Sequence, residues 1–240
     1  MPRRPGPTGG RDRRGGRGRA LRAVPATARP GLAAGDLMAS PALPVAGAVL
    51  AGGASRRMGT DKALLEVDGR PLVATACAAL RDAGAEPVVV VGGDPHAADV
   101  AGVEQVTDRW PGEGPLGGIL TALGHLDSDG TRHVAVLACD LPDASSRTVA
   151  TLLGHVRSSP ESVVVPVLEG VPQWLHAVWP PNARRVLLDS FEEGERAPWR
   201  AGRRLSVLEV PGLESSSLRD VDRPEDLGGR AAGGRTSRPD

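Results

Sequence analysis

The chain has 240 residues, 40% of them apolar and 24% charged, which is enough to build one domain with a hydrophobic core. No apolar run approaches the roughly 18 residues that a membrane-spanning helix needs, so we expect no contact with a membrane. Lysine plus arginine balance aspartate plus glutamate at 29 each, which excludes the uniformly basic composition of many nucleic-acid-binding proteins.

The charge is distributed unevenly along the chain. Residues 1–37 hold nine arginines against Asp12 and Asp36, a balance of +7, which leaves −7 for the other 203 residues. A negative remainder disfavours a nucleic-acid partner for the folded part, because such a partner is held mainly through its phosphates.

Residues 1–44 are rich in arginine, glycine and proline and offer little to bury, so we predict a disordered segment. This segment either binds RNA or another anionic surface, or precedes a true start at Met38 and has no role. Residues 228–240 are predicted to be disordered as well, which leaves 45–227 as the folded domain.

Within 45–227, apolar strands alternate with helices. The predicted strands are 45–50, 63–67, 88–91, 103–106, 133–138, 162–167, 173–179 and 205–210. The predicted helices are 71–83, 115–126, 145–156, 182–191 and 224–227. Strands that are apolar throughout, separated by helices, predict an α/β fold with a mostly parallel sheet covered on both faces. A functional site is then expected at the carboxyl ends of the strands.

A glycine-rich segment follows the first predicted strand and reads Leu50-Ala-Gly-Gly-Ala-Ser-Arg-Arg-Met-Gly-Thr-Asp-Lys62. Gly52 and Gly53 let the backbone approach a ligand and expose N–H groups, which is typical of an anion-binding loop. Lys62 is the only lysine in the chain, and its ammonium is a mobile point charge that suits a reacting phosphate. Lys62 is therefore a candidate catalytic residue, the alternative being a surface lysine without a role.

Cys139-Asp-Leu-Pro142 comes directly after the predicted strand 133–138. An aspartate at this place lies at the functional edge of a parallel sheet, and Mg²⁺ often takes one or two carboxylates together with substrate phosphates. Asp140 is therefore a candidate metal ligand; alternatively, it caps or turns the chain before the helix at Ser145.

Asp108 stands in Thr107-Asp-Arg-Trp110, which leads into Gly114-Pro-Leu-Gly-Gly118. Its carboxylate is placed to accept from a nucleobase or a ribose hydroxyl; by composition alone, a solvated loop is the better interpretation. The two cysteines, Cys77 and Cys139, are far apart and lack metal-ligand spacing, which favours a reducing, cytoplasmic compartment.

Taken together, three motifs resemble the molybdenum cofactor guanylyltransferases, a family of nucleotidyltransferases. They are Leu50-Ala-Gly-Gly-x-Ser-x-Arg-Met-Gly-x-Asp-Lys62, Asp108 with Gly114-Pro-Leu-x-Gly118, and Cys139-Asp-x-Pro142. The similarity extends over about 45–227, and the Asp-Lys ending favours this family over related cytidylyltransferases. The resemblance implies a three-layer α/β/α Rossmann-like fold.

The resemblance also implies roles for single residues. The backbone of the Leu50 segment would hold the base and ribose, Asp108 the guanosine portion, Lys62 and Arg57 the triphosphate, and Asp140 a Mg²⁺ ion. The nucleotide-binding residues are then Leu50, Ala51, Gly52, Gly53, Lys62, Asp108 and Asp140, and the catalytic residues are Lys62, Arg57 and Asp140.

Acceptor binding is carried over to Arg196, Asp220 and Asp222. The chain departs from the family here, because the family usually has asparagine at the last two positions. Asp220 and Asp222 are therefore an additional metal ligand, a pterin contact or a cap for the last helix. It departs again after the second long strand, where Gly92 or Gly93 replaces a family asparagine.

The implied reaction transfers GMP from GTP to the terminal phosphate of molybdopterin and releases pyrophosphate, with Mg²⁺ as cofactor. GTP and molybdopterin are the implied substrates, and molybdoenzymes or cofactor chaperones are further candidate partners. The alternatives are a molybdopterin cytidylyltransferase, a related enzyme acting on another phosphorylated acceptor, and a non-catalytic nucleotide-binding adaptor for cofactor delivery.

Overall fold

The computed structural model describes residues 43–52, 61–128, 130–221 and 232–233. Most of the predicted N-terminal segment 1–44, the predicted helix 224–227 and nearly all of the tail 228–240 lie outside these residues, so those predictions stay open.

The described residues form a central sheet with the strand order β10-β7-β9-β6-β1-β4-β5, and β8 pairs with β7. Strands β8 and β9 run antiparallel to their neighbours, while the other pairs are parallel. The predicted, mostly parallel sheet is thereby confirmed. The strands are β1 (Val45–Leu50), β4 (Val88–Val91), β5 (Glu104–Val106), β6 (His133–Ala138), β7 (Ser162–Leu168), β8 (Val171–Pro172), β9 (Val178–Trp179) and β10 (Ser206–Val210).

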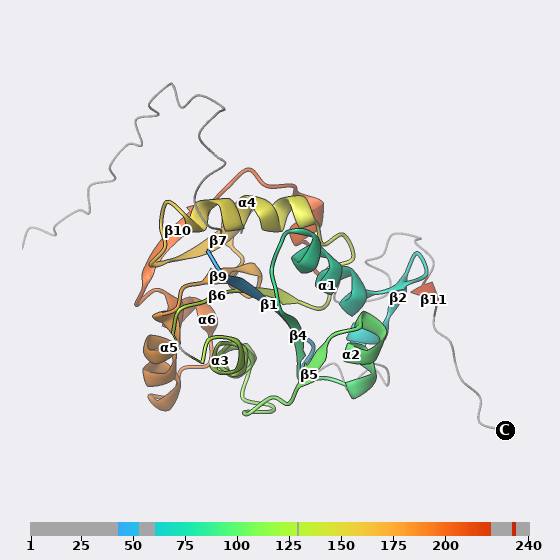
Figure 1. The fold of residues 1–240 in the computed structure, drawn as a ribbon, viewed down its shortest axis with the longest axis horizontal. Coiled ribbons are helices and arrows are strands. Elements are labelled where there is room, and N and C mark those ends of the chain that lie inside the picture. Colours follow the sequence, from blue (N-terminus) through green and yellow to red (C-terminus); the bar gives the residue numbers. More distant parts are fainter. Residues whose placement is uncertain (1–42, 53–60, 129, 222–231, 234–240) are drawn as a thin grey trace, which may run out of the picture. The chain divides into compact units, whose positions relative to one another are not determined.

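Helices cover both faces of this sheet, as Figure 1 shows. On one face, α1 (Leu72–Asp82), α2 (Pro95–Ala101) and α4 (Ser146–Val156) pack over side chains such as Val49, Val90 and Leu137. On the other, α3 (Pro115–Leu126), α5 (Ala183–Glu192) and α6 (Pro198–Gly202) pack over alternate side chains such as Val89 and Val136. The predicted three-layer α/β/α fold is confirmed.

A small second sheet holds β2 (Glu66–Val67), β3 (Arg70–Pro71) and β11 (Ala232–Gly233) in the order β11-β2-β3. Strand β2 comes after a short 3-10 turn, η2 (Lys62–Leu64). The turn and β2 together replace the single strand predicted for 63–67.

Two further expectations need correction. The range 173–179 was predicted as one strand, but it contains the 3-10 turn η3 (Trp174–His176) before β9. The sequence there is apolar because Trp174 and Trp179 are both buried, and burial alone does not fix an extended backbone. Helices α2 and α6 were not predicted, because each is short and each begins at a proline that reads equally well as a turn. In the described part of the chain, no helix has the length and apolar character to cross a membrane.

Helix α6 packs closely on η3 at Gly202, so a substitution there should change the stability of the protein. A Cβ on Gly202 would lie 2.3 Å from Cζ3 of Trp174, whereas a Cβ on Gly154 in α4 would meet no atom within 4 Å. We expect Gly202→Ala to lower the free energy of unfolding by about 1–3 kcal/mol, because the core must move to admit a methyl group.

Gly154→Ala serves as the matched control and should raise stability by up to about 1 kcal/mol, the usual gain for alanine over glycine inside a helix. Urea unfolding of both variants measures the difference. Equal effects of the two substitutions would contradict the tight packing of α6 on η3.

Candidate active site

Three parallel strands of the central sheet end at the same level. Leu50 at the end of β1 lies opposite Val91 of β4 on one side and Ala138 of β6 on the other. The segments that follow these strands therefore meet at one edge of the sheet, where the sequence predicted a site.

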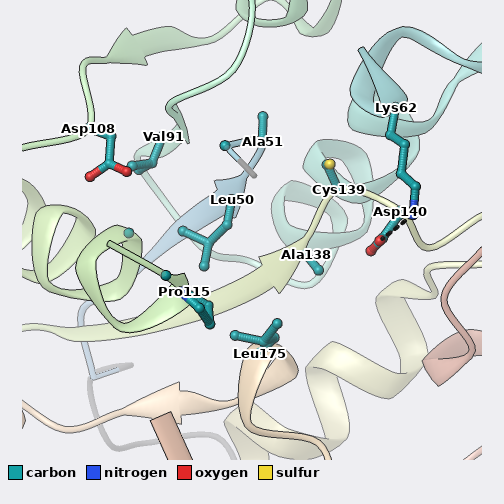
Figure 2. A pocket seen from close by; sticks show the side chains of 13 residues that line it. Leu50, Ala51, Lys62, Val91, Asp108, Pro115, Ala138, Cys139, Asp140 and Leu175 are labelled. Atoms are coloured by element: carbon teal, nitrogen blue, oxygen red, sulfur yellow. Dashed lines mark ion pairs between the residues drawn. The ribbon is translucent and has the colours of Figure 1, made fainter. Parts of the chain in front are cut away.

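A pocket opens at this edge, and Figure 2 shows the side chains around it. Six of the predicted site residues line it, namely Leu50, Ala51, Gly52, Lys62, Asp108 and Asp140. The other lining residues are Val91, Gly114, Pro115, Gly118, Ala138, Cys139 and Leu175. Segments far apart in the sequence thus form a single site.

The charged residues of the pocket lie at its two ends. Figure 2 shows Asp108 on one side of the Leu50–Ala51 backbone, and Lys62 together with Asp140 on the other. A ligand with a polar group at one end and an anionic group at the other would span this arrangement.

Lys62 and Asp140 form an ion pair, with 3.8 Å between the lysine Nζ and the carboxylate Oδ2. Their side chains are only 18% and 21% exposed, so water screens the pair less than it would at the surface. Lys62 begins the turn η2, and Asp140 follows β6. The lysine predicted to meet a phosphate and the carboxylate predicted to bind a metal are therefore neighbours.

Cys139 lines the same end of the pocket, but its thiol is unreactive. Burial raises the pKa of its thiol far above the usual range, and the carboxylates of Asp140 and Asp61 raise that pKa further. A thiol that stays protonated is a poor nucleophile, which argues against covalent catalysis through Cys139.

Asp108 is fixed at the opposite end by hydrogen bonds to its Oδ1. The backbone N–H of Trp110 and the hydroxyl of Thr121 each donate to this oxygen at 3.0 Å. The same hydroxyl accepts from the N–H of Arg109 at 3.1 Å. The other oxygen, Oδ2, lies towards Gly52, where a Cβ would be 3.9 Å away. Oδ1 thus holds the Asp108 side chain in place, and Oδ2 lies on the side of Gly52, which lines the pocket.

Helix α3 begins at the pocket. Gly114 and Pro115 line the pocket, and Gly118, one turn further on, packs against the side chain of Leu50. A side chain at Gly118 would begin 3.5 Å from the Leu50 Cδ2, so the small residue lets the helix approach β1 closely. The positive end of the helix dipole therefore points to the site.

Arg196, predicted to bind an acceptor, lies beside this helix start. Its guanidinium donates to Oε2 of Glu113 at 2.7 Å and to the carbonyl of Phe191 at 2.8 Å, and it stacks on the Phe191 ring at 3.9 Å. Its side chain is still 40% exposed. Arg196 therefore braces the loop before α3, and its role toward an acceptor stays a prediction.

Asp220, another predicted acceptor residue, is exposed next to Val221. The N–H of Val221 donates to the carbonyl of Asp140 at 3.0 Å, which brings this part of the chain to the Lys62–Asp140 end of the pocket. Gly53, Arg57 and Asp222 lie outside the described residues, so their predicted roles stay open.

The sequence analysis missed two residues of the site. Thr121 holds Asp108, and Leu175 of η3 forms a wall of the pocket. A threonine inside the apolar run 119–123 was a signal that could have pointed to a buried hydrogen bond. No such signal marked Leu175, because its position depends on a turn that was predicted as a strand.

His176, next to Leu175, does not line this pocket. It is 5% exposed, and its Nδ1 has no hydrogen-bond partner within the described structure. It lines a small second cavity under α4 whose other polar groups are the hydroxyls of Ser145, Thr148 and Ser217. Burial lowers the pKa of His176 to about 4, so the ring is neutral at physiological pH.

A resident metal would need ligands beyond Asp140. Over the described residues, no three His, Cys, Asp or Glu side chains gather closely enough to hold a metal ion by themselves. A single carboxylate is nevertheless compatible with Mg²⁺, which commonly takes one or two carboxylates and completes its shell with substrate phosphates and water.

Comparison with known proteins shows which family the chain resembles. Residues 47–207 match the model of the MobA-like NTP transferase domain. A probable molybdenum cofactor guanylyltransferase from Opitutus terrae is 38% identical over 195 residues, which cover 79% of this chain and 96% of the relative. A probable molybdenum cofactor guanylyltransferase from Methanothermobacter thermautotrophicus is 31% identical over 191 residues, or 75% and 95% of the two chains.

Among solved structures, the molybdopterin-guanine dinucleotide biosynthesis protein A from Archaeoglobus fulgidus superposes with a TM-score of 0.60. The match covers 76% of this chain and 94% of that protein at 23% identity, which supports the fold.

The buried His176 predicts a pH dependence of stability. Its pKa in the folded protein, about 4, lies below the ordinary value of 6.5, so the unfolded chain binds a proton more readily. Above about pH 6.5, titration of His176 should not change the free energy of unfolding. As the pH drops from there towards 4, the free energy of unfolding should fall by an amount of the order of 3 kcal/mol.

Unfolding free energies of the wild type and His176→Leu, measured from pH 8 to pH 4, test this. As the pH falls, the free energy of unfolding of the wild type should decrease relative to that of the variant. A difference that stays constant over this range would contradict a buried neutral imidazole.

Proposed function

The chain belongs to the MobA-like NTP transferase family, with the molybdenum cofactor guanylyltransferases, and we propose that it transfers GMP from GTP to molybdopterin. The observation that carries the proposal is the pocket with Asp108 at one end and the Lys62–Asp140 pair at the other. This spacing of groups suits a nucleoside triphosphate lying across the end of β1.

In this proposal, guanosine lies at the Asp108 end, and the backbone of Leu50–Gly52 runs beneath the base and ribose. Oδ2 of Asp108 accepts a hydrogen bond from the guanine or the ribose, while Thr121 holds the carboxylate in place. The triphosphate lies at the other end, against Lys62. Arg57 is proposed as a second cation for the phosphates.

The reaction joins two anions. An oxygen of the molybdopterin terminal phosphate attacks the α-phosphorus of GTP and forms a new P–O bond. The bond from the α-phosphorus to the bridging oxygen breaks, and its electron pair leaves with pyrophosphate. The attacking phosphate has a second pKa near 6 and is already an anion at neutral pH, so no general base is needed. The protonated thiol of Cys139 agrees with this chemistry, as does the place of His176 in a different cavity.

The site then acts by positioning the two substrates and neutralising the negative charge of their phosphates. Lys62 stabilises the negative charge that grows on the α-phosphate and the leaving pyrophosphate. Asp140 would hold Mg²⁺, which when bound supplies further positive charge at the phosphates. We place the acceptor near the Asp220 side of the pocket, with Asp222 and Arg196 as further candidates.

We further propose a cytoplasmic location for the protein, because both cysteines are buried free thiols, as expected under reducing conditions. Molybdoenzymes or their cofactor chaperones would receive the product.

The experiment is Mg²⁺-dependent pyrophosphate release by the full chain with molybdopterin and either GTP, CTP or ATP. Release with GTP, together with a guanine dinucleotide product, supports the proposal. Release with CTP instead would make the protein a cytidylyltransferase. Binding of GTP without release of pyrophosphate would overturn the catalytic proposal in favour of an adaptor.

Removal of the only lysine should be severe. We expect Lys62→Ala to lower kcat by at least about 100-fold, the scale for losing one preorganised electrostatic group. Arg157→Ala is the control, because it removes an exposed cation that follows the C-terminal end of α4. Similar rates for both variants would remove Lys62 from the mechanism.

Thr121 gives a second prediction, on affinity for the nucleotide. Thr121→Val keeps the shape of a fully buried side chain but removes the hydroxyl that holds Asp108. We expect KM for GTP to rise about 3- to 10-fold, in line with the loss of one hydrogen bond, with kcat less affected.

Thr121→Ser keeps the hydroxyl and should remain close to the wild type in KM. The same KM for the valine and serine variants would show that the hydrogen bond to Asp108 does not matter for GTP binding.

A further inference from the structure

Asp61, the residue before Lys62, uses both oxygens of its carboxylate. Oδ1 accepts from the N–H of Ala63 at 3.0 Å and so caps the turn η2, which begins with Lys62. Oδ2 accepts from the N–H of Asp94 at 2.9 Å, more than thirty residues further along the chain. One side chain therefore ties the turn that carries the lysine to a distant segment.

That distant segment is the turn Gly92–Asp94 after β4, which is itself held firmly. The N–H of Gly92 donates to the carbonyl of Val106 at 2.9 Å, and the side-chain amide of Gln105 donates to the carbonyl of Gly92 at 2.7 Å. Asp94 caps α2 by accepting from the N–H of His96 at 2.9 Å. The turn is thus a fixed point at the edge of the sheet.

The same turn also packs on the backbone after β1. Gly92 and Gly93 have φ values of 70° and 75°, which favour glycine. A Cβ on Gly92 would lie 3.2 Å from the Cα of Gly52, and a Cβ on Gly93 would lie 2.8 Å from the Cβ of Ala51. The turn therefore contacts the start of the glycine-rich segment directly and its end through Asp61.

We propose that Asp61 is a positioning residue for Lys62, which fixes the lysine relative to the floor of the nucleotide pocket through Asp94. This inference rests on the proposed role of Lys62 at the triphosphate. A lysine has a long flexible side chain, so the place of its ammonium depends on how firmly its backbone is held. Displacement of a catalytic group by about 1 Å can reduce a rate on the order of 100-fold.

The chemistry of the carboxylate matters for this role. Two N–H groups point at two different oxygens, and only a carboxylate offers an acceptor at both. An asparagine would present its NH₂ group to one of the donors. A serine could still accept from Ala63 as a helix cap, but its side chain is too short to reach Asp94 as well.

The experiment compares Asp61→Ala and Asp61→Ser with the wild type in the full chain, using GTP and molybdopterin. We expect both variants to lose kcat by about 10-fold or more, because each loses the tie to Asp94. Loss of a negative charge near the phosphates would by itself favour GTP binding, so KM for GTP should not rise. Asp99→Asn is the matched control, because it neutralises an aspartate on α2 that is 81% exposed.

A double-mutant comparison tests whether Asp61 acts through Lys62. In a Lys62→Ala background, Asp61→Ala should change the remaining rate by no more than about twofold, since coupled residues are not additive. A full additional loss in that background would overturn the inference, because Asp61 would then act independently of the lysine.

Amide hydrogen exchange tests the contact without any activity. The N–H of Asp94 should exchange faster in Asp61→Ala and Asp61→Ser, while the N–H of Gly92, which is bonded to Val106, should be unchanged. Unchanged exchange at Asp94 would overturn the tie itself. If Lys62→Ala alone keeps full activity, the proposed function of the lysine fails, whereas the exchange result still decides whether Asp61 holds the turn.

Discussion

The site depends on the position of β1 between two parallel neighbours. Because Leu50 is in register with both Val91 and Ala138, the three strands stop together, and whatever follows them must share one edge. The glycines of the turn after β4 then allow its backbone to touch Ala51 and Gly52. Asp140, which follows β6, is brought to this edge by the same register.

The same arrangement separates two kinds of chemistry along one pocket. At one end, the hydrogen bonds to Asp108 from Thr121 and Trp110 give a rigid acceptor that suits recognition of a nucleoside. At the other end lies the partly buried Lys62–Asp140 pair, which we have proposed as the site of the triphosphate and its metal. An enzyme that joins two phosphates needs little more, because positioning and electrostatics carry this class of reaction.

Much of this could be predicted from the sequence, because local patterns determine it. The valine run 88–91 and the apolar strand before Asp140 matched the structure, as did the helix that starts at Pro115. The turn at Trp174–His176 was predicted wrongly, since only packing against α6 distinguishes it from a strand. Among the residues that line the pocket, Leu50–Gly52, Lys62, Asp108 and Asp140 were named from motifs. The support from Thr121 and from the Asp61–Asp94 contact was not predicted, because it arises only from tertiary contacts.

The central claim is that one GTP lies across the end of β1 with its base towards Asp108 and its phosphates towards Lys62 and Asp140. A crystal structure of the full chain with Mg²⁺ and a GTP analogue that carries a methylene group between the α- and β-phosphorus tests it most directly. The account predicts guanosine beside Asp108 and the triphosphate at the Lys62–Asp140 end. A nucleotide bound in the reverse direction, or outside this pocket, would contradict it.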